Sequence, residues 1–223
     1  MIKRTLILSS LLTVSFFTDA NLLSAQSQQR SSWQPFFQRI VSRTPVPRKR
    51  GGGRGDWEVI SPGIWRKQLW TLQPSLIWRT SKQLPDRVEI LQAGSRTPLW
   101  SRTIQSGGTL SIAVKLEPSK TYLVRFLKRN ADLQKDEIVT AWEFQTLSIV
   151  QRQKVTADLD RINKKLKPLD QLQRRIEVFA KHELWSDAFQ EIERSSLSPT
   201  ERQTAIDQLL TQLKALESSQ RRS

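Results

Sequence analysis

Leu116-Glu-Pro-Ser-Lys-Thr-Tyr122 decides the fold, because it joins a turn to the most regular strand pattern in the chain. Glu117-Pro118 is a turn signal, and the residues after it alternate between apolar and polar. The apolar residues share one face of an extended chain: Tyr122, Val124 and Phe126. The pattern predicts a strand over 121–127 with one buried face.

Five further β-prone runs lie between residues 56 and 147, and turn residues separate them. These runs are 75–78, 87–91, 99–104, 109–114 and 139–147, with a turn over 130–136 before the last of them. Many short strands at such close spacing are typical of a β-sandwich of the immunoglobulin type. We therefore predict a β-sandwich domain over 56–147.

The L-x-P-x-x-x-Y spacing of Leu116–Tyr122 resembles the turn into strand F of fibronectin type III domains. In those domains the tyrosine hydroxyl bonds to nearby backbone and closes a Greek-key corner. Tyr122 is the only tyrosine in the chain, so the resemblance assigns that role to it. Trp78 resembles the core tryptophan of an early strand in the same fold. Both assignments are structural and imply no ligand.

Four amphipathic segments over 148–218 predict an antiparallel helical hairpin domain after the sandwich, which makes the chain α+β. The first apolar stripe runs from Val155 to Leu166, and Pro168 fits the first position of the next helix. Ser198-Pro-Thr-Glu201 reads as a capping box, in which Ser198 accepts a hydrogen bond from the backbone N–H of Glu201.

Phe179–Ile192 resembles half of a tetratricopeptide repeat, with Trp185 as a structural residue. Glu183 stands where the repeat usually has glycine, and no second copy follows at a period of about 34 residues. We therefore predict a hairpin that packs on the sandwich rather than a solenoid.

The composition excludes several classes of function. The 223 residues include no Cys and one His, which removes thiolate chemistry, iron–sulfur sites and His-rich metal sites. His182-Glu183 begins like a zincin motif, but Ser186 stands where the second metal ligand would be. No nucleophile elbow accompanies His182 for a catalytic triad. We predict no enzyme, metal or cofactor, while a hydrolase built on a carboxylate pair stays open as an alternative.

Residues 1–25 have the organisation of a secretory signal peptide. Lys3 and Arg4 precede the uncharged run Thr5–Phe17, and small residues follow at Ala20 and Ala25. The run is shorter than the roughly 20 residues that span a bilayer. The sequence predicts export to the periplasm or the extracellular space, and an uncleaved amphipathic anchor is the alternative.

Residues 26–55 are predicted to form a disordered basic arm. They hold seven Lys or Arg and no Asp or Glu, in a chain of net charge +15. The candidate contacts to a polyanion, such as anionic lipid or acidic glycan, are Arg39, Arg43, Arg48, Lys49, Arg50 and Arg54. Alternatively the arm is a solvated spacer, while the apolar residues of 33–40 dock on the body or on a membrane. Export argues against nucleic acid as a natural target.

Several motifs occur here in the order found in an uncharacterised secreted cyanobacterial family, known as a domain of unknown function, which the chain resembles. They are Gly51-Gly-Gly-Arg-Gly-Asp56, Pro74-Ser-Leu-Ile-Trp78, Leu99-Trp100, Leu116–Tyr122 and Leu184-Trp-Ser-Asp-Ala188. The resemblance implies export and a sandwich followed by helices. It implies no activity and supplies no functional residues.

These observations predict an exported, non-catalytic binding or scaffold protein of the cell envelope that engages a protein partner. The sandwich would offer strand edges to that partner, and the helical hairpin would offer a groove. Two alternatives stay open: an envelope polyanion binder that acts through the basic arm, and a hydrolase whose acids the sequence does not reveal.

Overall fold

The computed structural model describes residues 33–44, 57–63, 67–80, 84–105 and 107–220. The structure is α+β, as the sequence predicts. Its strands are β1 (Trp57–Ser61), β2 (Gln68–Leu69), β3 (Ser75–Thr80), β4 (Arg87–Gln92), β5 (Trp100–Thr103), β6 (Thr109–Ser111), β7 (Thr121–Asn130) and β8 (Lys135–Thr146). Its helices are one over residues 33–43, then α2 (Ile149–Asp160), α3 (Pro168–Lys181), α4 (Trp185–Glu193) and α5 (Pro199–Gln220). The predicted signal peptide lies outside the described residues.

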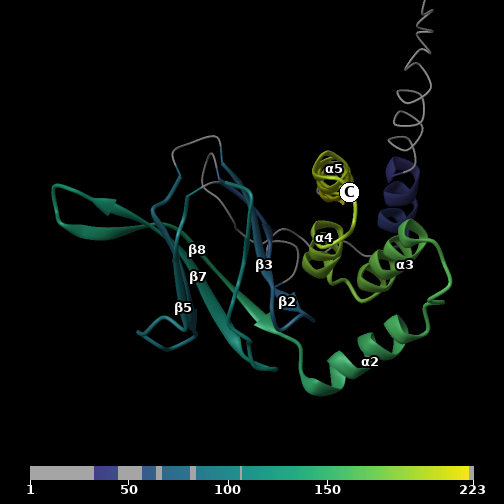
Figure 1. Cartoon of the computed structure of the whole chain (residues 1–223), viewed down its shortest axis with the longest axis horizontal. Coiled ribbons are helices and arrows are strands. Elements are labelled where there is room, and N and C mark those ends of the chain that lie inside the picture. Colours follow the sequence, from purple (N-terminus) through teal and green to yellow (C-terminus); the bar gives the residue numbers. More distant parts are fainter. Residues whose placement is uncertain (1–32, 45–56, 64–66, 81–83, 106, 221–223) are drawn as a thin grey trace, which may run out of the picture.

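The strands form two sheets that share one core (Figure 1). One sheet has the order β1-β3-β6 and the other has the order β2-β8-β7-β4-β5. Trp78 of the first sheet contacts Phe126 of the second, with their ring centroids 5.4 Å apart. Both side chains are buried, so the alternating apolar faces of the strands enclose the core between the sheets.

Tyr122 closes a corner at the start of β7. Its hydroxyl accepts a hydrogen bond from the backbone N–H of Glu117 at 2.8 Å. Its ring stacks on Phe144 of β8, with the centroids 5.5 Å apart. The backbone bond that the resemblance implies for Tyr122 is present, and Trp78 is a buried core residue as expected.

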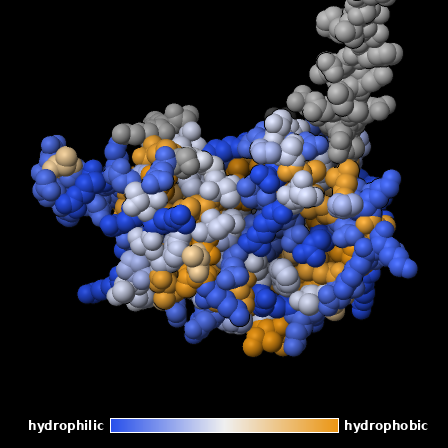
Figure 2. Space-filling view, viewed as in Figure 1, coloured by the Kyte–Doolittle hydropathy of each residue, from blue (hydrophilic) through white to orange (hydrophobic). Residues whose placement is uncertain are grey.

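The β7–β8 hairpin is longer than the sequence predicts. β7 continues to Asn130 and β8 begins at Lys135, where the sequence predicts a turn. Polar pairs hold the two strands together here: Asn130 donates to Glu137 at 2.7 Å, and Arg129 pairs with Asp136 at 3.5 Å. Apolar alternation does not reveal such a hairpin, which projects from the sheets and has a largely hydrophilic surface (Figure 2).

The helices after the sheets begin at signals that the sequence contains. Pro168 is the first residue of α3. At the start of α5, Ser198 accepts from the N–H of Glu201 at 3.3 Å, and Glu201 accepts from the N–H of Ser198 at 2.9 Å. α2 ends at Asp160 instead of Leu166, because Asn163 accepts from a backbone N–H two residues later and favours a turn.

Helix α4 lies between the sheets and α3, with α5 beside it (Figure 1). Its apolar residues are completely buried, including Trp185, Phe189 and Ile192. Buried residues of the sheets and of the helices form one continuous hydrophobic cluster. The helices are therefore a layer packed directly on the sheets.

Residues 33–43 form a helix, which corrects the prediction of a disordered arm for this part of the chain and confirms that its apolar residues dock on the body. Trp33, Phe36 and Phe37 are at most 4% exposed and belong to the common core. Apolar side chains at this spacing lie on one face of a helix, and their burial stabilises it. Within the described parts of the chain, no helix is both long and apolar enough to cross a membrane.

Candidate functional site

Asp187 of α4 binds the backbone that follows β2. One carboxylate oxygen accepts from the N–H of Trp70 at 2.8 Å, and the other accepts from the N–H of Thr71 at 2.9 Å. The Asp187 side chain is buried, with 2% of the residue exposed. Burial raises the pKa of Asp187 to about 7, although both N–H donors favour the charged form and oppose the rise.

Two neighbours of Asp187 on α4 bind further backbone of the sheets nearby. Ser186 accepts from the N–H of Gly63, after β1, at 3.0 Å. Gln190 accepts from the N–H of Ser75, at the start of β3, at 3.0 Å. These donors would otherwise be unpaired in a buried place, so α4 covers this side of the sheets with side-chain acceptors.

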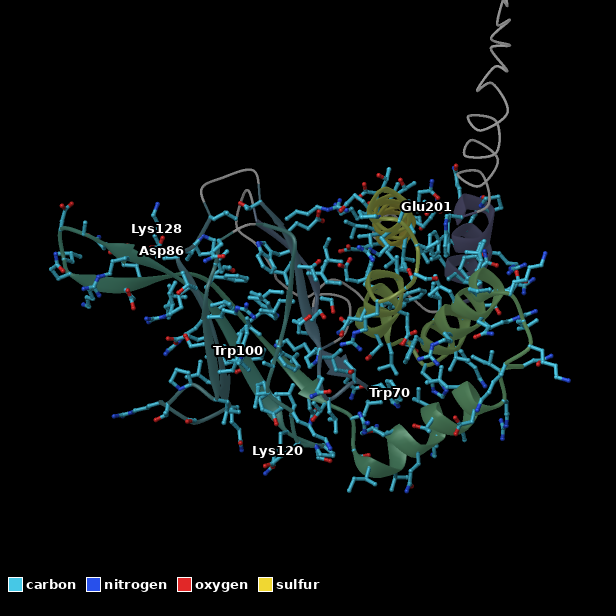
Figure 3. The ribbon with its side chains drawn as sticks, in the orientation of Figure 1. Trp70, Asp86, Trp100, Lys120, Lys128 and Glu201 are labelled. Carbon is cyan, nitrogen blue, oxygen red and sulfur yellow. The ribbon has the colours of Figure 1, made fainter. Side chains whose placement is uncertain are left out.

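Trp70 ties the same side of the sheets to α2 and α3 (Figure 3). Its indole N–H donates to the carbonyl of Arg152 at 3.3 Å, and its ring lies 5.6 Å from that of Phe179. The Arg152 guanidinium lies over the indole, 5.3 Å from its centroid. This aromatic side chain is therefore a packing residue between strand and helices.

The opposite edge of the two sheets consists of β5 and β6, each of which ends the strand order of its sheet. β5 lies on the side of the sheets away from the helices, where Trp100 is labelled (Figure 3). No described residue pairs with the outer side of either strand. This edge is the candidate functional site.

Backbone groups of β5 point outward at every second residue. The N–H of Ile104 bonds inward to the carbonyl of Asp86 at 2.9 Å. The two-residue alternation then turns the backbone groups of Ser101 and Thr103 away from β4. β5 can therefore accept hydrogen bonds from a further strand.

β6 shows the same alternation on the other sheet. The N–H of Ile112 bonds inward to the carbonyl of Pro74 at 3.1 Å. Thr109 and Ser111 consequently direct their backbone groups away from β3. The site thus has two short strands, one from each sheet, whose outer edges have no partner among the described residues.

A hollow of about 480 Å³ lies between these two edges. Its lining includes residues from three strands and from the segment after β5: Trp78, Arg102, Thr103, Gln105, Thr109 and Leu110. Among the described residues, the buried indole N–H of Trp78 has no acceptor. The hollow therefore combines apolar side chains such as that of Leu110 with several hydrogen-bond donors, as binding sites for polar ligands do.

A second hollow of about 550 Å³ lies beside the first, where β3 and β6 meet α4 and α5. Trp78 and Thr109 line both hollows. An ion pair between Arg79 and Asp207 bridges from β3 to α5 in this region. The second hollow extends the candidate site from the strand edge toward the helices.

The residues predicted to contact a polyanion are only partly described. Arg39 pairs with Glu177 of α3 at 2.9 Å and lies over the ring of Phe36. Arg43 is exposed near the end of the same helix. Arg48, Lys49, Arg50 and Arg54 lie outside the described residues. The structure does not bring these candidates together into one site.

His182 joins two helices in the structure. It lies 3.0 Å from Asp158 of α2, which also accepts from Lys181 at 2.9 Å and from Arg161 at 2.8 Å. The bonds from Lys181 and His182 lower the pKa of Asp158. In the described ranges, no group of three or more His, Asp or Glu residues could hold a metal ion.

Sequence reasoning missed the polar side chains of α4. Trp185, Ala188, Phe189 and Ile192 lie at i, i+3, i+4 and i+7, on one face of the helix, so the sequence indicates an exposed face for the polar residues between them. Ser186, Asp187 and Gln190 are buried because backbone after β1, after β2 and at the start of β3 packs against them, which no local pattern indicates. Arg102 was missed because the sequence predicts its strand but not the pairing of that strand with β4. This pairing decides on which face of the sheet the Arg102 side chain lies.

Comparisons of the chain with protein-family models, with curated proteins and with solved structures give no match.

Proposed function

We propose that this chain is an exported, non-catalytic binding protein of the cell envelope. Its site is the β5–β6 edge, which takes an extended segment of a partner protein as an additional strand. The predicted signal peptide over residues 1–25 supports export, and the helices stabilise the sheets from the other side.

We also propose that the two sheets form a fibronectin-type sandwich. With β2 set aside as a short addition beside β8, strands β1, β3 and β6 oppose β5, β4, β7 and β8. Without β2, the fourth strand in chain order is β5, and it pairs with β4, the third strand. In constant-type immunoglobulin domains the fourth strand pairs instead in the sheet that contains the first strand. The bond from Glu117 to Tyr122 supports the same assignment. Domains of this class commonly act through their exposed edges and loops.

The difference between the two edges carries the proposal. On the side of β1 and β2, α4 covers the backbone, because Ser186, Asp187 and Gln190 accept from N–H groups just after β1, just after β2 and at the start of β3. At the β5–β6 edge, the described residues leave such groups open. Proteins usually cover or shorten free edges, and β5 and β6 are short enough to limit self-association.

The site also offers room for side chains of the added segment. Successive residues of an extended segment point to opposite faces, so every second side chain would face the hollow between the sheets. A hollow of about 480 Å³ can hold one or two such side chains. Backbone pairing would supply affinity, and the hollow would supply selectivity.

The test uses Ser101→Pro, with Ser101→Ala as the matched control. Proline removes the outward N–H of Ser101 without breaking a bond to β4, whereas alanine keeps it. Random peptides displayed on phage are selected on the full chain and measured against both variants. We expect binding to fall about tenfold or more in Ser101→Pro and to be unchanged in Ser101→Ala. Equal binding to all three proteins, or no enrichment at all, would contradict the proposal.

A further inference from the structure

We propose that the hollow at the β5–β6 edge recognises an acidic side chain of the added segment through Arg102. This inference rests on the proposed function and names the chemistry of the partner. The ligand is an extended peptide with Asp or Glu at the position that faces the hollow.

Arg102 occupies an inward position on its strand. It pairs in register with Val88 of β4, a fully buried core residue, and Trp100 pairs with the buried Ile90. Side chains of directly paired residues lie on the same face of a sheet. Arg102 therefore extends from the core side of β5 toward the hollow, where it is part of the lining.

The pairing of Arg102 differs from that of other arginines on the same sheet. Arg87 and Arg125 both pair with Glu89, at 3.1 Å and 2.7 Å. No carboxylate lines the hollow, and within the described chain no Asp or Glu lies within ion-pair distance of Arg102. Its positive charge is therefore available to a ligand.

The other polar groups of the hollow suit the same ligand. Trp78 is 2% exposed, and its N–H is a buried donor that lacks an acceptor among the described residues. A carboxylate accepts several hydrogen bonds at once and would satisfy donors of this kind, whereas an ammonium group would satisfy none.

The experiment compares Arg102→Gln with Arg96→Gln. Arg96 is an exposed residue of the turn between β4 and β5, so its variant has the same change in charge outside the hollow. The full chain and both variants are offered three libraries of short random peptides, with the central residue fixed as Glu, Gln or Lys. Thermal melting followed by circular dichroism checks that both variants are folded.

We expect the Glu library to be enriched about fivefold over the Gln library on the full chain and on Arg96→Gln. On Arg102→Gln this preference should disappear. If the three libraries enrich equally, the inference is wrong while strand addition stands, and Arg102 only protects the edge against self-association. If no library is enriched, the proposed function itself fails. Binding of alginate oligosaccharides that requires Arg102, without peptide binding, would also overturn the inference in favour of an acidic glycan.

Discussion

Polar side chains on α4 accept hydrogen bonds from backbone N–H groups of the sheets, as the carbonyls of a further strand do in other sheets. Each accepts a hydrogen bond from a backbone N–H that the sheet leaves unpaired. Asp187 is the most demanding of them, because a buried carboxylate loses its hydration. Its two backbone donors offset only part of that loss, and its pKa stays raised.

Asp187→Asn is predicted to change the dependence of stability on pH. The pKa of Asp187 is about 7 in the folded chain and 3.8 as the ordinary value, so the folded state binds more protons between these values. The contribution of Asp187 to the free energy of unfolding is therefore fully present below pH 3.8, and it is lost as pH rises through 7. The advantage of the natural chain over Asp187→Asn should shrink over this interval, by about 1.4 kcal/mol per unit of pKa difference.

The measurement is the free energy of unfolding in urea at several pH values from 4.5 to 8, an interval of about 3.5 units chosen around the raised pKa. Glu193, which is half-buried at the end of the same helix, offers Glu193→Gln as a control. A constant difference between the natural chain and Asp187→Asn across this interval would contradict the role of Asp187.

Tyr122→Phe should destabilise the chain by about 1 kcal/mol or more. The substitution removes the acceptor of the Glu117 N–H but keeps the ring that stacks on Phe144. The midpoint of chemical denaturation measures the effect. An unchanged midpoint would mean that the corner bond does not stabilise the fold.

At the scale of elements, local signals in the sequence predict most of the strands and the helix starts. β-prone runs between turn residues predict β3 and β4, apolar alternation predicts β7, and Pro168 and Ser198 mark the starts of α3 and α5. These features depend on residues close in the chain. That is why a single sequence reveals them.

Elements that depend on distant partners are predicted less well. The helix over residues 33–43 is ordered through burial of residues such as Phe37, although its sequence neighbours are basic and polar. The tip of the β7–β8 hairpin depends on cross-strand polar pairs such as Asn130 with Glu137. The candidate site itself requires two strands from different sheets, so no local pattern contains it.

Ser198→Ala is predicted to cost the last helix about 1 kcal/mol, because it removes the acceptor for the Glu201 N–H. The pKa of Glu201 is lowered by its bonds to Ser198, so the capping box should weaken as pH falls and this carboxylate is protonated. Thermal unfolding followed by circular dichroism measures the loss. Thr200→Ala, at an exposed position in the same turn, is the control; equal melting temperatures for the two variants would show that Ser198 is not the stabilising cap.

At the scale of the whole molecule, β5 lies on the side of the sheets away from the helices (Figure 1), whereas the second hollow of the candidate site reaches α4 and α5. α4 buries the β1–β2 edge, and the remaining helices pack around it. This arrangement leaves β5 and β6 as the edges at which a partner can extend the sheets. The central claim is that an extended partner segment pairs with β5.

Hydrogen exchange at individual amides tests this claim most directly, with the full chain free and bound to a peptide selected on it. The account predicts that the outward amides of Ser101 and Thr103 exchange about tenfold or more slowly in the complex, because they become donors to the added strand. Amides of α2, such as that of Thr156, should exchange at the same rate in both states. Binding that leaves Ser101 and Thr103 unprotected, or that protects only the helices, would contradict the account.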